Sequence, residues 1–395
     1  GGEMMSDWDQ CGAQYGCTPR LRSEAPGRVN LIGEHIDYLG GCVMPVAIEP
    51  KITLLVAPKS NGGKIELWSA EQEDTKYKIS PKDFTPRTIP EEHWLNYAIG
   101  VMGAYAEQGV MTPGCRVGIF SSLPAGAGLS SSAALETAFA LLIEELSGQS
   151  CSILERALRC QRAEHEWVGV PCGIMDQLSV GAGLKNHALL IDCQEQSIKP
   201  VRLPKGLNLV VADSGVKHAL ADGEYRERRQ DCEAALEILH ENSWRNISLE
   251  SVLKNQDALG DRLFKRARHA VTEMQRVNEF SDALINNQIP KMAQLMRDSH
   301  NSLRNDFEVS CPELDVLVDA GFAFGVEKGH AGSRMTGAGF GGSTIHLVHE
   351  SIASSFIEHL RSRYQKAFGR ELNCFITQAS DGARLQPLST LKPAL

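Results

Sequence analysis

The segment SSLPAGAGLSSSAALETAFALLIEELSG, residues 121–148, joins a glycine-rich loop to a helical pattern. It follows the apolar run CRVGIF (115–120), which predicts a β-strand. After the loop, apolar residues recur at helical spacing and form one stripe: Leu135, Phe139, Leu142, Ile143 and Leu146. The segment therefore predicts a strand, a glycine-rich turn and a buried helix over 131–147.

The loop offers the chemistry of a phosphate site. Gly126 and Gly128 permit backbone conformations that other residues avoid. Hydroxyls and backbone N–H groups at the helix start come from Ser130, Ser131 and Ser132, and the N-terminus of a helix attracts anions. A serine cap after a glycine turn would give the same pattern, so both interpretations stay open. No lysine follows the glycines as in a Walker A loop.

Length and charge limit the classes of function. The 395 residues are enough for two domains, each with its own core. Hydrophobic residues make up 42% of the chain and charged residues 23%, which is typical of a globular protein. With a net charge of −9 and no long basic run, we expect neither nucleic acid nor a membrane as a partner.

The eleven cysteines are odd in number, scattered, and include no C-x-x-C pair. This pattern favours reduced thiols over a disulfide framework or a zinc site. We therefore expect a cytoplasmic protein.

Strand and helix patterns alternate irregularly along the chain. KITLLVAP (51–58) and NLVVADSG (208–215) predict strands, and 152–168 and 224–240 carry helical periodicity. Irregular mixing favours an α+β fold over a doubly wound sheet. We expect a domain boundary near residue 200, with closely packed domains, because no flexible linker is evident.

Two further segments bear on function. GRVNLIGEHIDY (27–38) reads as a half-buried strand that ends in Glu34, His35 and Asp37, three polar groups that are costly to place near a core. RMTGAGFGGSTIHLV (334–348) is a second glycine loop that leads into an apolar strand. Either segment alone could be an ordinary turn, but together with the serine loop they are harder to dismiss.

These motifs resemble, in order and spacing, those of the GHMP small-molecule kinases, and within them the galactokinases. The matching segments are GRVNLIGEHIDY, GLSSSAAL, MTGAGFGG, AEHEWVGVPCGIMDQ and DSGVKHALADGEYRERRQDCEAA. The resemblance implies a two-lobed α+β fold with the active site between an N-terminal domain (1–200) and a C-terminal domain (201–395). It also implies transfer of the ATP γ-phosphoryl group to the anomeric hydroxyl of galactose, giving galactose 1-phosphate.

The resemblance assigns roles on the sugar side. Glu34, His35 and Asp37 would read sugar hydroxyls, because a selective site for an uncharged sugar needs fixed donors and acceptors. Gly173 would let the sugar approach the backbone, and Tyr225 would close over it, although Tyr225 also fits a core-edge aromatic.

The catalytic assignment also comes from the resemblance. Asp176 would lie beside the attacking hydroxyl, with Arg28 holding that carboxylate ionised. Whether Asp176 removes a proton early or mainly orients the hydroxyl stays open. A helix cap or a satisfied core acid is the alternative for a lone aspartate.

For the nucleotide, we expect ATP with Mg²⁺, which uses few protein ligands. Glu164, on a helical stripe with Ile153, Ala157 and Cys160, and Ser131 are the expected metal ligands; a buried salt bridge is the alternative for Glu164. The aromatic residues Trp94 and Tyr97 resemble those of the family's adenine pocket, although the helical spacing of Trp94, Ala98, Val101 and Tyr105 also fits core packing. The expected ATP-binding residues are Gly126, Gly128, Leu129, Ser130, Ser131, Ser132, Trp94 and Tyr97.

Two positions depart from the usual galactokinase pattern. Ile36 and Leu39 replace a threonine and an asparagine, and EHIDY is the form of N-acetylgalactosamine kinase relatives. A kinase for N-acetylgalactosamine or a uronic acid is therefore the alternative. A non-catalytic galactose sensor is a further alternative, but such sensors have a shortened serine loop and this loop is complete.

Overall fold

A computed structural model describes residues 6–58, 61–72, 75–80, 94–217 and 221–388. Its first lobe is built on a six-stranded sheet, antiparallel except between β4 and β6. In spatial order the strands are β13 (Arg384–Pro387), β1 (Leu21–Asn30), β3 (Pro45–Pro58), β6 (Cys115–Ser121), β4 (Ile65–Ser69) and β5 (Lys76–Ile79). The predicted strands at 51–58 and 115–120 are confirmed as parts of β3 and β6.

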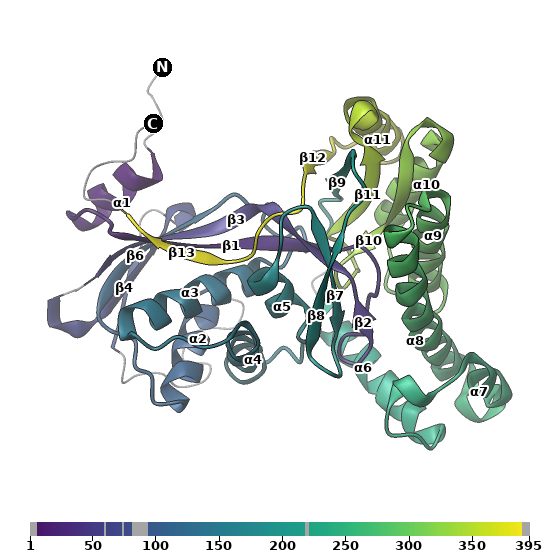
Figure 1. Ribbon diagram of the computed structural model, residues 1–395, viewed down its shortest axis with the longest axis horizontal. Helices are drawn as coiled ribbons and strands as arrows, with labels where there is room; N and C mark the ends of the chain where they lie inside the picture. Colours follow the sequence, from purple (N-terminus) through teal and green to yellow (C-terminus); the bar gives the residue numbers. More distant parts are fainter. Residues whose placement is uncertain (1–5, 59–60, 73–74, 81–93, 218–220, 389–395) are drawn as a thin grey trace.

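Helices cover one face of this sheet (Figure 1). They are α2 (Leu95–Glu107), α3 (Ser131–Ser147), α4 (Ile153–Ala163) and α5 (Met175–Ala182), while α1 (Asp7–Tyr15) lies near the far end. The predicted helix over 131–147 is confirmed as α3, and its Phe139, Leu142 and Ile143 are fully buried. Burying a side chain of this size contributes about 1.5–3 kcal/mol.

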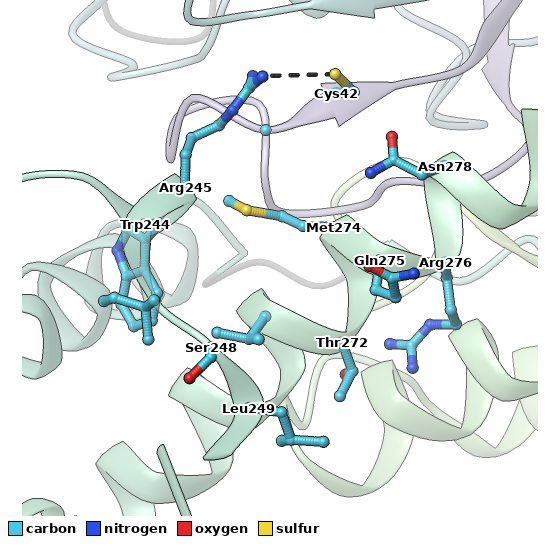
Figure 2. A pocket seen from close by; sticks show the side chains of 13 residues that line it. Cys42, Trp244, Arg245, Ser248, Leu249, Thr272, Met274, Gln275, Arg276 and Asn278 are labelled. Atoms are coloured by element: carbon cyan, nitrogen blue, oxygen red, sulfur yellow. Dashed lines mark hydrogen bonds between the residues drawn. The ribbon is translucent and has the colours of Figure 1, made fainter. Parts of the chain in front are cut away.

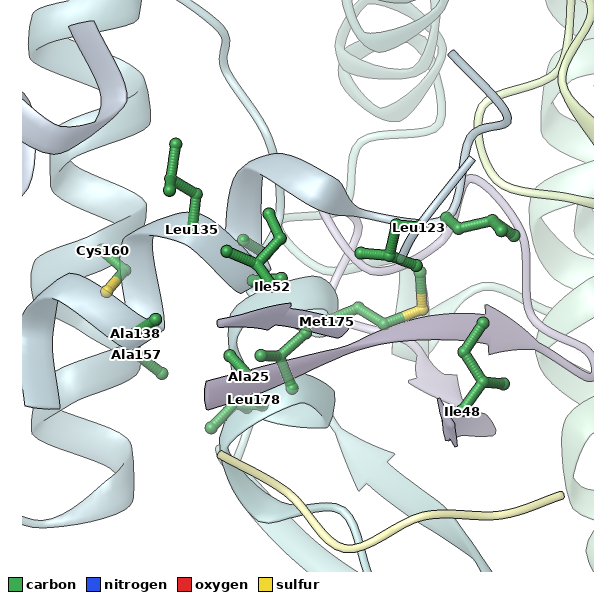
Figure 3. Packing of buried hydrophobic residues seen from close by; sticks show 14 of the residues in the cluster. Ala25, Ile48, Ile52, Leu123, Leu135, Ala138, Ala157, Cys160, Met175 and Leu178 are labelled. Carbon is green, nitrogen blue, oxygen red and sulfur yellow. The ribbon is translucent and has the colours of Figure 1, made fainter. Parts of the chain in front are cut away.

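Close packing between α3 and its neighbours forms the core of this lobe (Figure 3). Small residues let the backbones approach, and larger side chains fill the space against the strands. Members of this cluster are Ala25 on β1, Ile48 and Ile52 on β3, Leu135 and Ala138 on α3, Ala157 and Cys160 on α4, and Met175 and Leu178 on α5.

The helix predicted over 152–168 is split in the structure. The helix α4 ends at Ala163, and a π-helical turn, Glu164–Val168, continues from it. Ile153, predicted on the inward stripe, is 43% exposed, whereas Ala157 and Cys160 are buried as expected. The Ile153 side chain lies beside Gly181 of α5 and is covered on that side only in part, so it keeps contact with solvent.

The second lobe holds a four-stranded antiparallel sheet, with helices stacked beside it (Figure 1). Its strand order is β10 (His330–Thr336), β11 (Ser343–His349), β9 (Leu207–Asp213) and β12 (Asn373–Thr377). The helices are α6 (Ala221–Ile238), α7 (Leu249–Lys254), α8 (Gln256–Ile285), α9 (Ile289–Asn305), α10 (Pro312–Phe324) and α11 (Ala353–Phe368). The strand predicted at 208–215 and the helix predicted at 224–240 are confirmed as β9 and α6.

The lobes meet at several places. A small sheet of β2 (Cys42–Val43), β7 (His187–Asp192) and β8 (Ser197–Arg202) lies between them, next to α8. After β12, the chain returns to the first sheet, where β13 pairs with β1. The expected boundary near residue 200 stays a prediction. Across the described ranges, no helix has both the length and the apolar character needed to cross a bilayer.

Candidate active site

A cavity of about 170 Å³ lies where the two lobes meet. The first lobe contributes the end of β1, the turn over residues 33–38 and the start of α5; the second contributes α6 and the loop after β10. Its lining includes seven residues expected on the sugar and catalytic side: Arg28, Glu34, His35, Asp37, Gly173, Asp176 and Tyr225. Residues more than 130 positions apart in sequence thus come together around one small space.

Arg28 and Asp176 form an ion pair on the wall of this cavity. The Arg28 Nε donates to Asp176 Oδ1 at 2.7 Å, and Nη2 donates to Oδ2 at 3.3 Å. The β1–β3 register shifts between Pro26 and Arg28, and a bulge of this kind turns the side chain that follows it. Burial lowers the pKa of Arg28, but Asp176 and Glu34 outweigh that effect and the net shift is upward.

Glu34 is held from several sides. Its Oε1 accepts from the backbone N–H of Gly337 at 2.9 Å and lies 3.5 Å from Nη2 of the buried Arg334. Burial raises the pKa of Glu34, partly offset by Arg334 and Arg28. The carboxylate of Glu34 therefore connects the 33–38 turn of the first lobe to the glycine loop of the second.

His35 already uses both ring nitrogens within the protein. Its Nε2 donates to the carbonyl oxygen of Ala338 at 2.7 Å, so Nδ1 accepts from the Tyr38 hydroxyl at 2.8 Å. Burial lowers the pKa of His35 to about 3, which keeps the ring neutral. The expected contact of His35 with a sugar hydroxyl stays a prediction. In the structure, both ring nitrogens of His35 form hydrogen bonds with other residues of the protein.

Asp37 and Gly173 fit tightly against each other. A Cβ atom on Gly173 would overlap the Asp37 carboxylate, so this position requires glycine. Burial, together with the charges of Asp176 and Glu34, raises the pKa of Asp37 to about 7.

The aromatic ring of Tyr225 closes one side of the cavity. Its centroid lies 5.5 Å from that of the His35 ring and 5.4 Å from that of the Tyr38 ring.

A second pocket, of about 240 Å³, lies beside the serine loop. Trp94 and Tyr97 line it together with aliphatic side chains from β3, β6 and α3, and with Gly126, Ser131 and Ser132. Ala98, Val101 and Tyr105, which follow Trp94 at helical spacing, are fully buried. Helix α2 therefore has both a core face and residues that border the pocket.

The serine loop does not form a simple cap. Ser130 precedes α3 with φ of 63° and makes no side-chain capping bond. Its buried hydroxyl has no hydrogen-bond partner among the described residues. The two glycines of the loop also have positive φ, 70° at Gly126 and 73° at Gly128. A non-glycine residue in this strained conformation marks the loop as a candidate ligand site.

The serine loop and the second glycine loop contact each other. Gly128 faces Gly342, where an added Cβ would lie 3.7 Å from the Gly342 Cα, and the Ser343 hydroxyl donates to the Ala127 carbonyl at 2.7 Å. Arg28 Nη1 also donates to the Gly128 carbonyl at 3.0 Å. The same guanidinium therefore touches the sugar-side carboxylate and the serine loop.

Glu164 lies at the start of the π-helical turn, with hydrogen bonds to neutral groups. Its Oε1 accepts from the Ser132 hydroxyl at 3.1 Å and from Gln177 Nε2 at 3.2 Å. Gln177 also reaches the buried Glu136. Burial raises the pKa of Glu164 to about 7 and that of Glu136 well above its usual range. No lysine or arginine among the described residues forms an ion pair with Glu164, so the salt-bridge alternative has no partner there.

Trp167 fixes the position of this turn. The Trp167 ring packs so closely on α2 that a Cβ on Gly103 would overlap it, and a Cβ on Gly100 would come within 2.9 Å of the Trp167 Cβ.

The hydroxyl that contacts Glu164 belongs to Ser132. The expected metal ligand Ser131 is its neighbour and also lines the pocket. Across the described ranges, no three His, Cys, Asp or Glu side chains form a metal-binding group, so the metal ligation by Glu164 and Ser131 stays a prediction.

Comparisons with known proteins agree with these motifs. Residues 12–58 match the family described as the galactokinase galactose-binding signature, 96–183 the GHMP kinases N terminal domain, and 280–366 the GHMP kinases C terminal. The galactokinases of Bos taurus and Homo sapiens are each 41% identical to this chain over 377 residues, which is 94% of both chains compared. The chain belongs to the galactokinase family.

Solved structures extend this result to the fold. The crystal structure of Lactococcus lactis galactokinase complexed with galactose has a TM-score of 0.89 and 30% identity, covering 95% of this chain and 98% of that one. Methanococcus jannaschii mevalonate kinase has a TM-score of 0.65 at 18% identity, covering 92% and 99%, and shares the fold. The two-lobed α+β fold expected from the resemblance is confirmed.

Some groups around this galactokinase-family site were not among the expected residues. Arg334 and Gly337 hold the Glu34 carboxylate, while Gln177 and Glu136 surround Glu164. The glycine loop motif is a sequence signal for Gly337 and for the adjoining Arg334. Glu136 lies within the apolar pattern of α3, where a single acid gives no signal by itself.

Proposed function

We infer that this protein is an ATP-dependent galactokinase, which phosphorylates galactose at the anomeric hydroxyl to give galactose 1-phosphate. The family membership supports this activity, and so does the pairing of a sugar-sized cavity with a neighbouring pocket beside a serine loop. In the reaction, the anomeric hydroxyl gives up its proton to Asp176 or to water, and its oxygen bonds to the γ-phosphorus as the bond from that phosphorus to the β–γ bridging oxygen breaks. ADP leaves.

The main observation behind this proposal is the position of the Arg28 guanidinium between the two pockets. It contacts Asp176 in the sugar cavity through Nε and the Gly128 carbonyl of the serine loop through Nη1. A phosphoryl group passing from one pocket to the other would cross near this side chain. We propose that Asp176 accepts the hydrogen bond of the attacking hydroxyl, and that Arg28 orients the Asp176 carboxylate and offsets the charge of the transferring group.

On the sugar side, Glu34 and Asp37 accept sugar hydroxyls, Gly173 brings the backbone close to the ring, and Tyr225 covers it. A buried acceptor that loses its hydroxyl partner costs free energy, so these groups discriminate between sugars. We assign His35 to the support of this surface, because its nitrogens already bind Ala338 and Tyr38.

On the nucleotide side, Trp94 and Tyr97 would hold the adenine, and the serine loop, with Gly126, Gly128, Leu129 and Ser130, would hold the phosphates. The positive φ of Ser130 and its unpartnered hydroxyl support a ligand at this loop. Helix α3 has no acidic residue of its own in its first turn, and the Glu164 carboxylate beside Ser132 is the group that we assign to the metal.

We propose Mg²⁺ as the metal, with Glu164 and a hydroxyl of the serine loop, Ser131 or Ser132, as its protein ligands. The oxygen donors fit this hard cation, since the Ser132 hydroxyl lies 3.1 Å from the Glu164 carboxylate beside the pocket. When bound, the ion would neutralise charge on the ATP phosphates. Glu164 must lose its proton to act as a ligand, and its raised pKa ties metal binding to pH.

Galactose is the preferred sugar over N-acetylgalactosamine or a uronic acid. The two positions that depart from the usual pattern do not line the cavity: Ile36 is fully buried in the core, and Leu39 packs against it. Their substitution therefore removes no group from the cavity wall.

We also propose that the enzyme works in the cytoplasm. All eleven cysteines are free thiols, as expected for a reducing compartment.

The direct test is ADP release with ATP and Mg²⁺ across galactose, N-acetylgalactosamine, glucose and galacturonate. We expect the highest kcat/KM with galactose. Turnover of another sugar in the absence of galactose turnover would overturn the proposed specificity, and no turnover of any sugar while galactose still binds would indicate a sensor.

A further inference from the structure

Helix α8 of the second lobe passes directly behind the 33–38 turn. Glu273, fully buried on α8, accepts through Oε2 from the backbone N–H of Glu34 at 3.1 Å and of Gly33 at 3.3 Å. The Ser299 hydroxyl of α9 donates to the same oxygen at 2.6 Å. One carboxylate therefore satisfies two adjacent N–H groups of the turn that carries the Glu34 side chain.

His269, four residues earlier and one turn away on the same helix, binds the other polar group of this backbone. Its Nε2 donates to the Glu34 carbonyl at 3.0 Å, and its Nδ1 accepts from the Ser302 hydroxyl at 2.7 Å. Burial lowers the pKa of His269 to about 4, so the ring is a neutral donor at this atom. Both backbone polar groups of Glu34 are thus held by side chains of α8.

Arg276 supplies the countercharge for Glu273. Its Nε donates to Glu273 Oε1 at 2.7 Å. Burial by itself raises the pKa of Glu273, but Arg276 and other positive groups outweigh it and hold that pKa at about 2. Figure 2 shows Arg276 with Thr272 and Gln275 along α8, lining a hollow of about 530 Å³. The ionised carboxylate is therefore buried, while its arginine partner reaches this hollow.

The turn needs such support because its backbone is strained. The strain lies at the non-glycine His35, which has φ of 59°, whereas Gly33 adopts its φ of 101° without steric cost because it has no Cβ. Without partners for their N–H groups, residues 33 and 34 would relax toward more favourable conformations and carry the Glu34 carboxylate with them. A displaced Glu34 carboxylate would meet a sugar hydroxyl in poorer hydrogen-bond geometry, so galactose would bind more weakly.

We propose that Glu273 is a positioning residue, which fixes the 33–38 turn through its backbone and thereby sets the affinity for galactose without touching the sugar or ATP. The proposal rests on the inferred role of Glu34 in sugar binding. It makes α8, outside the sugar cavity, a determinant of the galactose site.

Glu273→Gln tests the proposal with little change of size. A glutamine has one accepting oxygen, so it cannot accept from both the turn and Arg276, and its amide N–H₂ must face a donor on one side. We expect the KM and the calorimetric Kd for galactose to rise at least tenfold. The KM for ATP should change less than twofold and kcat less than threefold.

Glu144→Gln is the matched control. Glu144 on α3 is a buried carboxylate that binds Arg156 at 2.7 Å and accepts from the backbone N–H of Cys151 at 3.0 Å, but it lies in the first-lobe core. We expect this variant to lose thermal stability comparably and to keep its galactose KM. Ser299→Ala, which removes one donor to Glu273, is the milder second variant, and about a threefold rise in galactose Kd is expected.

Two results would overturn the proposal. One is an unchanged galactose Kd in folded Glu273→Gln, or in Ser299→Ala if the first variant does not fold. The other is an equal rise of the galactose and ATP KM values, as a general loss of structure would give. If the wild-type protein binds galactose without phosphorylating it, the proposed function is refuted instead. Comparing the galactose Kd of wild type and Glu273→Gln would still decide the role of Glu273.

Discussion

Asp176→Asn separates the catalytic interpretation of the Arg28–Asp176 pair from a structural one. The substitution keeps the shape of the side chain and replaces one carboxylate oxygen with an N–H₂ group. In the structure both oxygens of Asp176 accept from Arg28, at 2.7 and 3.3 Å. One of these contacts must therefore be lost, and the negative charge beside the attacking hydroxyl disappears.

The expected cost to folding is modest. A hydrogen bond to a charged group contributes about 1.5–3 kcal/mol when buried. The Asp176 side chain is 30% exposed, so water replaces part of the lost contact, and Arg28 keeps its bond to the Gly128 carbonyl. We expect a loss of about 1–2 kcal/mol in unfolding free energy.

The expected cost to catalysis is larger. Loss of a principal electrostatic or proton-handling group removes about 2–4 kcal/mol of transition-state stabilisation. That range corresponds to a fall in kcat of about 30- to 1000-fold. Coupled ADP release gives kcat, and thermal denaturation gives the stability.

Asp222→Asn is the control, because Asp222 lines the same cavity and forms no ion pair among the described residues. It should leave kcat within a few fold of wild type. A near-normal kcat in Asp176→Asn with an unchanged melting temperature would remove Asp176 from the mechanism. A large loss of stability with proportionate loss of active protein would make the pair structural.

Two other perturbations have clear expected signs. Glu164→Gln should shift the Mg²⁺ activation curve to higher concentration with little loss of stability in the absence of nucleotide; an unshifted curve with a large fall in melting temperature would make Glu164 structural. Because the Asp37 pKa is raised to about 7 in the sugar-free protein, ionising it costs folding stability as pH rises from about 4 toward 8. Asp37→Asn should therefore be the more stable protein at pH 8. Wild-type galactose Kd should fall about tenfold between pH 6 and pH 8 as the ionised fraction of Asp37 grows. Calorimetry in which both proteins show the same pH profile would contradict this.

The spacing of apolar residues predicted those helices and strands that have one continuous buried face. The apolar stripe of α3 was enough to give 131–147, because every turn of that helix packs against the sheet or a neighbouring helix. The same reasoning was wrong for Ile153, the first residue of α4, whose side chain is 43% exposed although it lies beside Gly181 of α5. The π-helical turn after Ala163 also carries no sequence signal, although it sets where Glu164 points.

In the candidate site, only the residues that lie within the sequence motifs could be predicted. Glu34, Asp176 and the serine loop lie in segments with a family pattern, and the structure brings them close together. Glu273 and His269 lie about 240 residues from the turn they hold, within a 30-residue helix whose periodicity only separates a buried face from an exposed one. A sequence pattern cannot say which buried polar residue of that face meets which distant backbone group.

The pairing of β13 with β1 has a consequence for how the protein is made. Residues 384–387 supply the edge strand of a sheet whose other strands all lie before residue 122. During synthesis the N-terminal part of a chain usually folds first. Here one side of β1 must stay uncovered until residues 384–387 have left the ribosome. A nascent chain stalled after residue 200 would thus expose an unpaired strand, the surface to which chaperones and other unfolded chains bind.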